Sequence, residues 1–255
     1  MINDKLKLMC GLPIPIGDIE IKPYTLKEIA EIGYTDYMSI LGMLFLDTDY
    51  FLKELRGESF FMEIYEKKHL LTPFDFYMML ANNGGFGESL KHSLSLVFRV
   101  SEDDIHIDNE NSVVFITSNE DVKLIIDKDV FARIVDVLKY QNGLKGFSKE
   151  ESDEFNPADE KAQALIDKMK ANRAKVEKIK SEEDEDGDLD IFDIVSAITA
   201  RSNSLNKIDV LNLTIFQIYD ELSRLQMVDA YENYIKASMA GAKLDGEIPH
   251  WSNKI

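Results

Sequence analysis

Apolar positions alternate with other residues over 12–23, and the pattern becomes helical from Thr25. Residues 12–23 place prolines and charges between isoleucines, which predicts an extended edge segment, because interior prolines are incompatible with a central strand. Thr25 and Glu28 have the spacing of a capping box, in which each side chain bonds the other residue's backbone amide. A helix is therefore predicted to begin at Thr25 and to end at Gly33.

The following stretch, from residue 34 to residue 80, is rich in aromatic residues at helical spacing. It predicts several short helices, one of which begins at Thr72-Pro73, because threonine is a good cap and proline suits the first helical position. After a glycine-rich break at 82–87, the pattern becomes helical again over 88–98. The glycines match neither dinucleotide-binding nor P-loop spacing, so we interpret them as a turn.

Three short apolar runs follow, at 104–108, 113–117 and 122–126, separated by turn residues. This pattern predicts a small antiparallel meander. A helix is predicted from about Lys128, and Asn142-Gly143 closes it.

The last block, 191–242, predicts two helices with a break near Ser202-Asn203-Ser204. The second helix is long and has an apolar residue every three or four positions. The stripe consists of Leu211, Ile215, Ile218, Leu222, Leu225, Val228, Tyr231 and Ile235. Such a stripe must lie against something, which is either the protein's own core or a partner.

These elements predict a mainly helical (α+β) fold: a helical body with a small antiparallel meander or hairpin, and a long C-terminal helix. Three segments are expected: an N-terminal domain at 1–147, a charged linker at 148–190, and a C-terminal segment at 191–255 that packs on the N-terminal body.

The charge pattern limits the classes of partner. The formal net charge is −18, and residues 148–190 alone hold 8 basic and 15 acidic side chains. We expect no nucleic-acid binding, because such affinity depends on Lys and Arg displacing counterions. No apolar run approaches the roughly 18 residues that a membrane span needs, so we expect a soluble, cytosolic protein without a membrane partner.

The sequence nominates no catalytic residue and no cofactor. Cys10 is the single cysteine, and four scattered histidines do not have the spacing of a zinc site. The 47 acidic residues single out no catalytic pair, and nucleophile-elbow, zincin and kinase spacings are absent. We therefore expect a protein that is not an enzyme.

One acidic stretch resembles a calcium-binding loop. Oxygen-bearing side chains fall at loop positions 1, 3, 5, 9 and 12, with glycine at position 6. These residues are Glu182, Asp184, Asp186, Asp190 and Asp193. Glutamate at the first position and the short aspartate at the last depart from the usual pattern, so a hydrated acidic linker is the favoured interpretation.

Both ends of the chain resemble one family. The segments are Ile19–Tyr37, Ala237–Lys243 and His250–Ile255, which together cover under a third of the chain. In these residues the protein resembles the tail assembly chaperones of long-tailed bacteriophages of Gram-positive hosts.

The resemblance implies a non-enzymatic factor of the host cytoplasm that holds the tape-measure protein soluble and delivers it to the growing tail. It leaves the major tail protein open as a second partner. The candidate contact residues are Leu222, Leu225, Tyr231, Tyr234 and Trp251. All five are equally compatible with a core role. An alternative is an acidic phage-encoded inhibitor that mimics DNA and occupies a host protein. The sequence does not indicate the oligomeric state.

Overall fold

The structure is a computed structural model that describes residues 2–57, 61–81, 85–118, 121–144, 190–241 and 250–252. The chain divides into two compact units. Unit 1 contains Met1–Gly146 and Ile208–Glu221, and unit 2 contains Phe147–Lys207 and Leu222–Ile255. Residues 208–221, which the sequence pattern assigned to the C-terminal segment, thus belong to unit 1. The described part is mainly helical with two small antiparallel sheets, as predicted.

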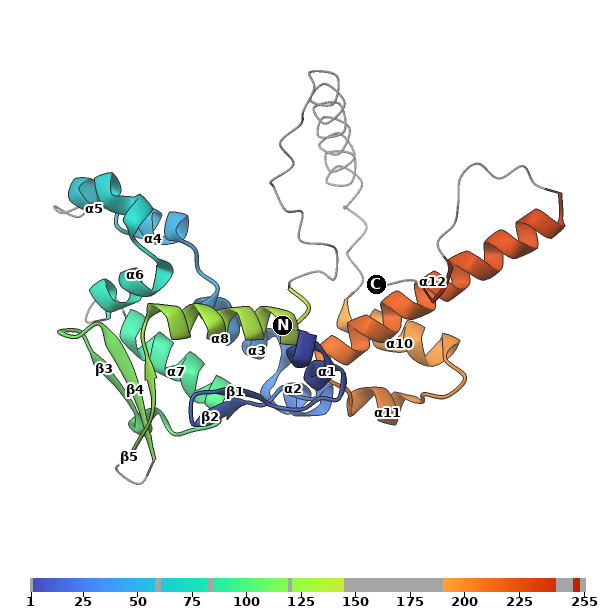
Figure 1. The fold of residues 1–255 in the computed structure, drawn as a ribbon, viewed down its shortest axis with the longest axis horizontal. Coiled ribbons are helices and arrows are strands. Elements are labelled where there is room, and N and C mark those ends of the chain that lie inside the picture. Colours follow the sequence, from blue (N-terminus) through green and yellow to red (C-terminus); the bar gives the residue numbers. More distant parts are fainter. Residues whose placement is uncertain are drawn as a thin grey trace, which may run out of the picture. The chain divides into compact units, whose positions relative to one another are not determined.

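The elements of unit 1 are mostly short (Figure 1). Its helices are α1 (Ile2–Met9), α2 (Leu26–Ile32), α3 (Tyr34–Leu44), α4 (Thr48–Glu54), α5 (Phe61–Lys67), α6 (Pro73–Leu80), α7 (Phe86–Phe98) and α8 (Lys128–Gln141), with the 3-10 turns η1 (Lys68–Leu70) and η2 (Glu102–Asp104). Its strands are β1 (Ile14–Ile16), β2 (Ile19–Ile21), β3 (Ile105–Asp108), β4 (Val113–Ser118) and β5 (Asp121–Ile126). Near the C-terminus come α10 (Ile191–Arg201), α11 (Lys207–Leu211) and α12 (Ile215–Met239), and α12 runs from unit 1 into unit 2.

The predicted helix starts are confirmed by their caps. At α2 the Thr25 hydroxyl accepts the Glu28 amide at 3.2 Å, and the Glu28 carboxylate accepts the Thr25 amide at 2.8 Å. Gly33, with φ of +100°, follows the last residue of this helix. Thr72 caps α6 in the same reciprocal way, with Asp75 as its partner and Pro73 in the first turn. Short polar side chains therefore fix where these helices begin.

The meander is also confirmed, with strand order β3-β4-β5. Ile105, Ile116 and Leu124 occupy one row across the sheet and are buried. The neighbouring row is His106, Phe115 and Ile125, which is more exposed. Figure 1 shows the sheet beside α7 and α8, which contact β3 and β5 respectively. The segment predicted to be extended forms the β1-β2 hairpin.

The core of unit 1 contains packed aromatic rings from three helices, α4, α6 and α8. Phe51 of α4 stacks on Phe76 of α6, with ring centroids 5.3 Å apart and nearly parallel planes. Tyr77 meets Phe51 edge-on at 5.0 Å and also contacts Phe131 of α8. Rings of this size contribute much of the burial in a small core.

A half-buried polar cluster joins α2 to the C-terminal end of α7. The guanidinium of Arg99 lies 3.9 Å from the ring centre of Tyr24 and donates to the Glu28 carboxylate at 2.9 Å. This hydrogen bond is the main reason that the pKa of Glu28 falls from about 4.5 to about 2. Arg99 itself ends α7 in the left-handed region, with φ of +55°.

Residues 208–221 complete unit 1 through backbone pairing. Thr25 and Thr214 form an antiparallel bridge, and the Leu26 amide donates to the Leu213 carbonyl at 2.9 Å. The Gln217 side chain bonds the Thr214 amide at 2.8 Å and donates to the Met9 carbonyl at 2.8 Å. One capping group of α12 therefore also holds the end of α1.

Two features near the ends of the chain were not anticipated from the pattern. Helix α1 was not predicted, and the block expected to hold two helices contains the additional short helix α11. Leu211, the first member of the predicted stripe, lies in α11, because Thr214 caps α12 and starts it at Ile215. The predicted linker lies outside the described residues except for Asp190. Among the described helices, none is both long and apolar enough to cross a membrane.

Candidate functional site

Helix α12 changes character along its length. The fully buried side chains of this helix are Ile215, Phe216 and Ile218, all in its first turn and in unit 1. Beyond Ile218 its apolar side chains are half-buried or exposed, and Met239 near its end is 84% exposed. The part of α12 in unit 2 therefore has apolar surface that the described structure does not cover completely.

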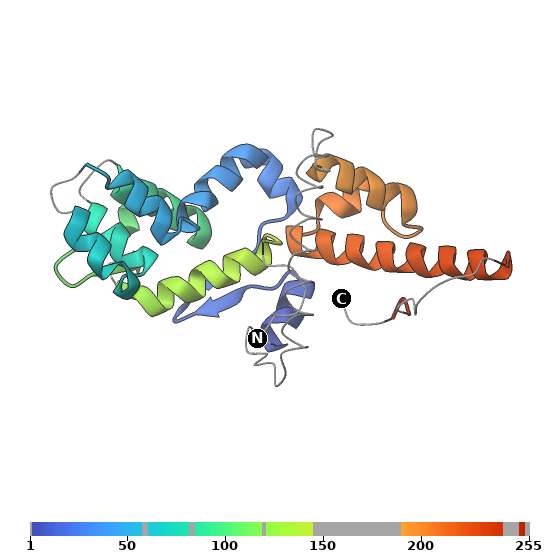
Figure 2. The ribbon, with the colours of Figure 1, turned by 90° about the horizontal axis from the view of Figure 1, so that it is seen from above.

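One side of this helix is held by an ion pair with α10. The Arg201 guanidinium donates to Asp229 at 2.6 Å and to Glu232 at 3.4 Å. Both views of the ribbon place α10 beside α12 (Figure 2). Leu222 and Leu225 precede Asp229 by seven and four positions, which places them on the same side of the helix. Two of the predicted contact residues therefore lie on the side that meets α10.

The opposite side meets the residues at 250–252. The Tyr231 ring lies edge-on to His250 with centroids 4.9 Å apart, and His250 lies 5.3 Å from Trp251. Arg224, seven positions before Tyr231, donates to the Trp251 carbonyl. Tyr234 follows Tyr231 by three positions and is half-buried near the same side. We call Arg224, Tyr231, His250 and Trp251 the C-terminal cluster.

The five predicted contact residues thus divide between two sides of α12. Tyr231 and Trp251 come together through His250, whereas Leu222 and Leu225 face the other way. Trp251 is 45% exposed, so part of it is accessible to a partner. Arg224 was not predicted as a contact residue, although its spacing of seven positions from Tyr231 places both on one side of a helix.

The predicted calcium loop lies largely outside the described residues. Of its five candidate ligands, Asp190 and Asp193 are described. The Asp190 carboxylate accepts the Asp193 amide at 2.8 Å and caps α10. Within the described ranges, no group of three or more His, Cys, Asp or Glu side chains has an arrangement that would hold a metal ion. Ion binding by the whole loop stays the untested alternative to the favoured interpretation, a hydrated acidic linker.

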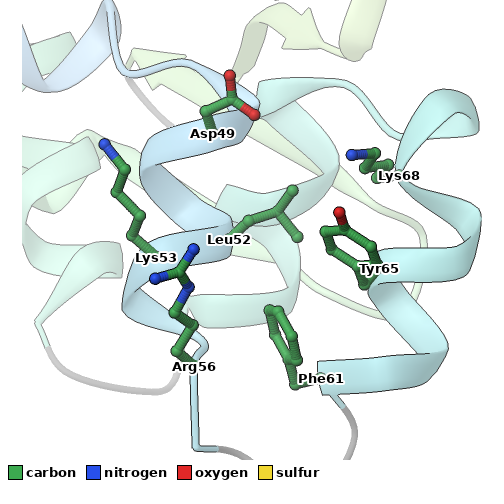
Figure 3. A pocket seen from close by; sticks show the side chains of 7 residues that line it. All are labelled: Asp49, Leu52, Lys53, Arg56, Phe61, Tyr65 and Lys68. Atoms are coloured by element: carbon green, nitrogen blue, oxygen red, sulfur yellow. The ribbon is translucent and has the colours of Figure 1, made fainter.

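Unit 1 contains a separate small cavity between α4 and α5 (Figure 3). Its volume is about 240 Å³. Three cationic side chains, one acid and three apolar or aromatic side chains line it: Lys53, Arg56, Lys68, Asp49, Leu52, Phe61 and Tyr65. This site was not predicted from the sequence, because its basic residues lie on α4, in the turn that follows α4 and in η1. Their clustering depends on how those elements pack.

The comparisons connect the C-terminal part of the chain to one family. Residues 179–255 match the family model described as the YomV second domain, a phage-derived protein family. The matched segment is under a third of the chain and includes the five predicted contact residues and the C-terminal cluster. No curated protein and no solved structure matches the chain.

Proposed function

We propose that this chain is a phage tail assembly chaperone that binds the tape-measure protein through the unit 2 part of α12 and the C-terminal cluster. The supporting observation is that the segment similar to the phage-derived YomV second domain is also the segment whose long helix has incompletely covered apolar side chains. In this proposal the protein acts by binding and performs no bond-making step.

The physical basis is the combination of apolar helix surface with negative charge. A client that is a long helix binds through apolar side chains at helical spacing, which α12 also offers. The net charge of −18 opposes self-association of the loaded complex, because like-charged particles repel. The aromatic side chains of Tyr231 and Trp251 are of the type that contributes most at protein interfaces.

The direct test is co-expression of the full chain with the tape-measure protein of the same phage. We expect the client to become soluble and to co-elute with this chain on a sizing column. Combining Tyr231→Ala with Trp251→Ala is expected to lower the co-eluting client by at least about tenfold, because aromatic anchors at interfaces often contribute about 2 kcal/mol or more.

Phe192→Ala is the matched control, because Phe192 is an aromatic residue of unit 2 that lies on α10 and is exposed. It is expected to leave the yield of complex within about twofold of the unchanged protein. A client that stays insoluble alongside the well-folded wild-type chain would contradict the proposal. Equal loss in the control and the double variant would remove the assignment to the C-terminal cluster.

A further inference from the structure

We propose that the cavity between α4 and α5 binds an acidic peptide segment of a partner protein, with one large aromatic side chain inserted and carboxylates on either side of it. The cavity lies wholly in unit 1 and shares no residue with α12 or the C-terminal cluster. This second binding site therefore goes beyond the proposed client site and does not depend on it.

The size of the cavity suits a single side chain. Sites for drug-sized molecules usually have about 300 to 1,000 Å³, and this cavity has about 240 Å³. Leu52 points between the two walls, and the Phe61 and Tyr65 rings form the α5 side (Figure 3). These rings contact each other, with centroids 5.6 Å apart, so an inserted aromatic group would meet them on one side and Leu52 on the other.

The incomplete docking of α5 keeps this apolar lining accessible. No residue of α5 is fully buried, and Tyr65 is 44% exposed. Met62, on the same helix, is more exposed still. A partner side chain therefore has both an apolar floor and an open approach.

The charge around the cavity indicates the chemistry of the partner. Lys53, Arg56 and Lys68 line it against the single acid Asp49, in a chain whose total charge is strongly negative. None of the three cations forms an ion pair with a described residue, and Lys68 lies 4.3 Å over the Tyr65 ring. Uncompensated cations beside an apolar floor favour carboxylates next to an aromatic side chain.

A peptide explains this combination better than a nucleic acid does. A nucleic-acid strand places a phosphate at every nucleotide, so its repulsion by the acidic chain grows with length. A short acidic peptide has few charges, and its aromatic side chain gains from burial against Leu52 and Phe61. The proposal therefore commits to a peptide segment of a protein partner.

The test is calorimetric titration of the full chain with the blocked pentapeptide Glu-Glu-Phe-Glu-Glu at low salt. We expect saturable binding that weakens as salt is raised, because the contacts are partly ionic. A second peptide with serine in place of phenylalanine is expected to bind about tenfold more weakly, since the aromatic anchor is lost.

Charge reversal separates this site from general attraction. Lys53→Glu combined with Arg56→Glu is expected to weaken binding at least about tenfold, whereas Lys27→Glu is expected to change it less than twofold. Lys27 is an exposed lysine of α2 that does not line the cavity. All three positions are at the surface or next to it, so circular dichroism should show unchanged helix content.

Several results would overturn the proposal. No binding by the wild-type chain, or equal binding of the serine peptide, would exclude an aromatic-acidic ligand. Displacement of the peptide by inorganic phosphate or by a short oligothymidylate at equal concentration would indicate a general anion site. Because the tape-measure protein takes no part in the titration, failure here leaves the co-expression result unaffected, and the reverse also holds.

Discussion

The core of unit 1 and the unit 2 part of α12 use apolar residues in opposite ways. In unit 1, Phe51, Phe76 and Tyr77 are completely buried and pack against one another. Along α12 beyond Ile218, no side chain of the helix is fully buried, although the apolar positions recur just as regularly. The same spacing of apolar residues thus accompanies complete burial in one region and partial cover in the other.

This difference shows that regular apolar spacing indicates which side of a helix packs against other residues. It does not indicate whether those residues belong to the same protein or to a partner. Complete burial of a ring stabilises the fold by about 1.5 to 3 kcal/mol, whereas a half-covered ring contributes less to stability and is available to a partner. Among residues of equal hydrophobicity, those that are buried in the described structure therefore have a structural role, and those that are partly exposed are candidates for binding.

The largest expected effect comes from exchanging one phenylalanine in each region for alanine. Phe51→Ala removes a fully buried ring and leaves a cavity, so we expect a loss of about 3 to 5 kcal/mol in the free energy of unfolding. Phe192→Ala removes a ring that is 70% exposed and is expected to change this free energy by less than about 0.5 kcal/mol. Urea denaturation followed by circular dichroism measures both, and similar losses would refute the contrast.

A smaller effect separates two buried tyrosines within unit 1. The Tyr37 hydroxyl donates to the Asn142 side chain at 2.9 Å, whereas the buried Tyr77 hydroxyl has no hydrogen-bond partner in the described structure. Burial raises the pKa of both hydroxyls, so both stay neutral. Tyr37→Phe should cost about 1 to 2 kcal/mol, because the Asn142 oxygen loses its donor.

Tyr77→Phe is the matched variant and should be neutral or slightly stabilising, because it removes an unpaired polar group. Thermal unfolding of the two variants in parallel provides the measurement. If Tyr77→Phe is as damaging as Tyr37→Phe, then the Tyr77 hydroxyl has a partner that this structure does not show.

The smallest effect concerns Glu28 and depends on pH. Its folded pKa of about 2 lies below its ordinary value near 4.5, so its carboxylate stabilises the fold above about pH 4.5 and loses this effect as the pH falls toward 2. Glu28→Gln keeps the cap geometry but removes the charge. It should cost about 1 kcal/mol at pH 7, because the pair with Arg99 is a third exposed.

The cost of Glu28→Gln is expected to shrink as the pH is lowered through this range. Urea titrations between pH 7 and pH 3 check it. Glu31→Gln, an exposed neighbour on α2, serves as the control and should show no such trend. A cost for Glu28→Gln that stays constant with pH would mean that the Arg99 pair does not stabilise unit 1.

Local signals explain why much of the fold was predictable from the sequence. The caps at Thr25 and Thr72 and the turns of the meander act over a few residues, and the structure confirms each of them. The start of α12 follows the same rule, because Thr214 and Gln217 have capping-box spacing and each side chain bonds the other residue's backbone amide.

Other features depend on packing between distant residues and have no local signature. The cavity between α4 and α5 depends on packing that brings Arg56, which follows α4, close to Lys68 of η1. The predicted contact residues lie on two sides of α12. These sides are distinguished by the ion pair of Arg201 with Asp229 and by the contact of His250 with Tyr231, both of which depend on tertiary structure. Of the five candidate calcium ligands, the structure describes Asp190 and Asp193, and Asp190 caps a helix.

The bridge between Thr25 and Thr214 has a consequence for biosynthesis. A ribosome completes the first 146 residues of unit 1 well before it adds Leu213, whose carbonyl receives the Leu26 amide. During translation the Leu26 amide therefore gains this partner only after about 190 further residues have been made. Folding of unit 1 is expected to finish late, and a stalled nascent chain would expose the backbone groups that the segment around Leu213 later satisfies.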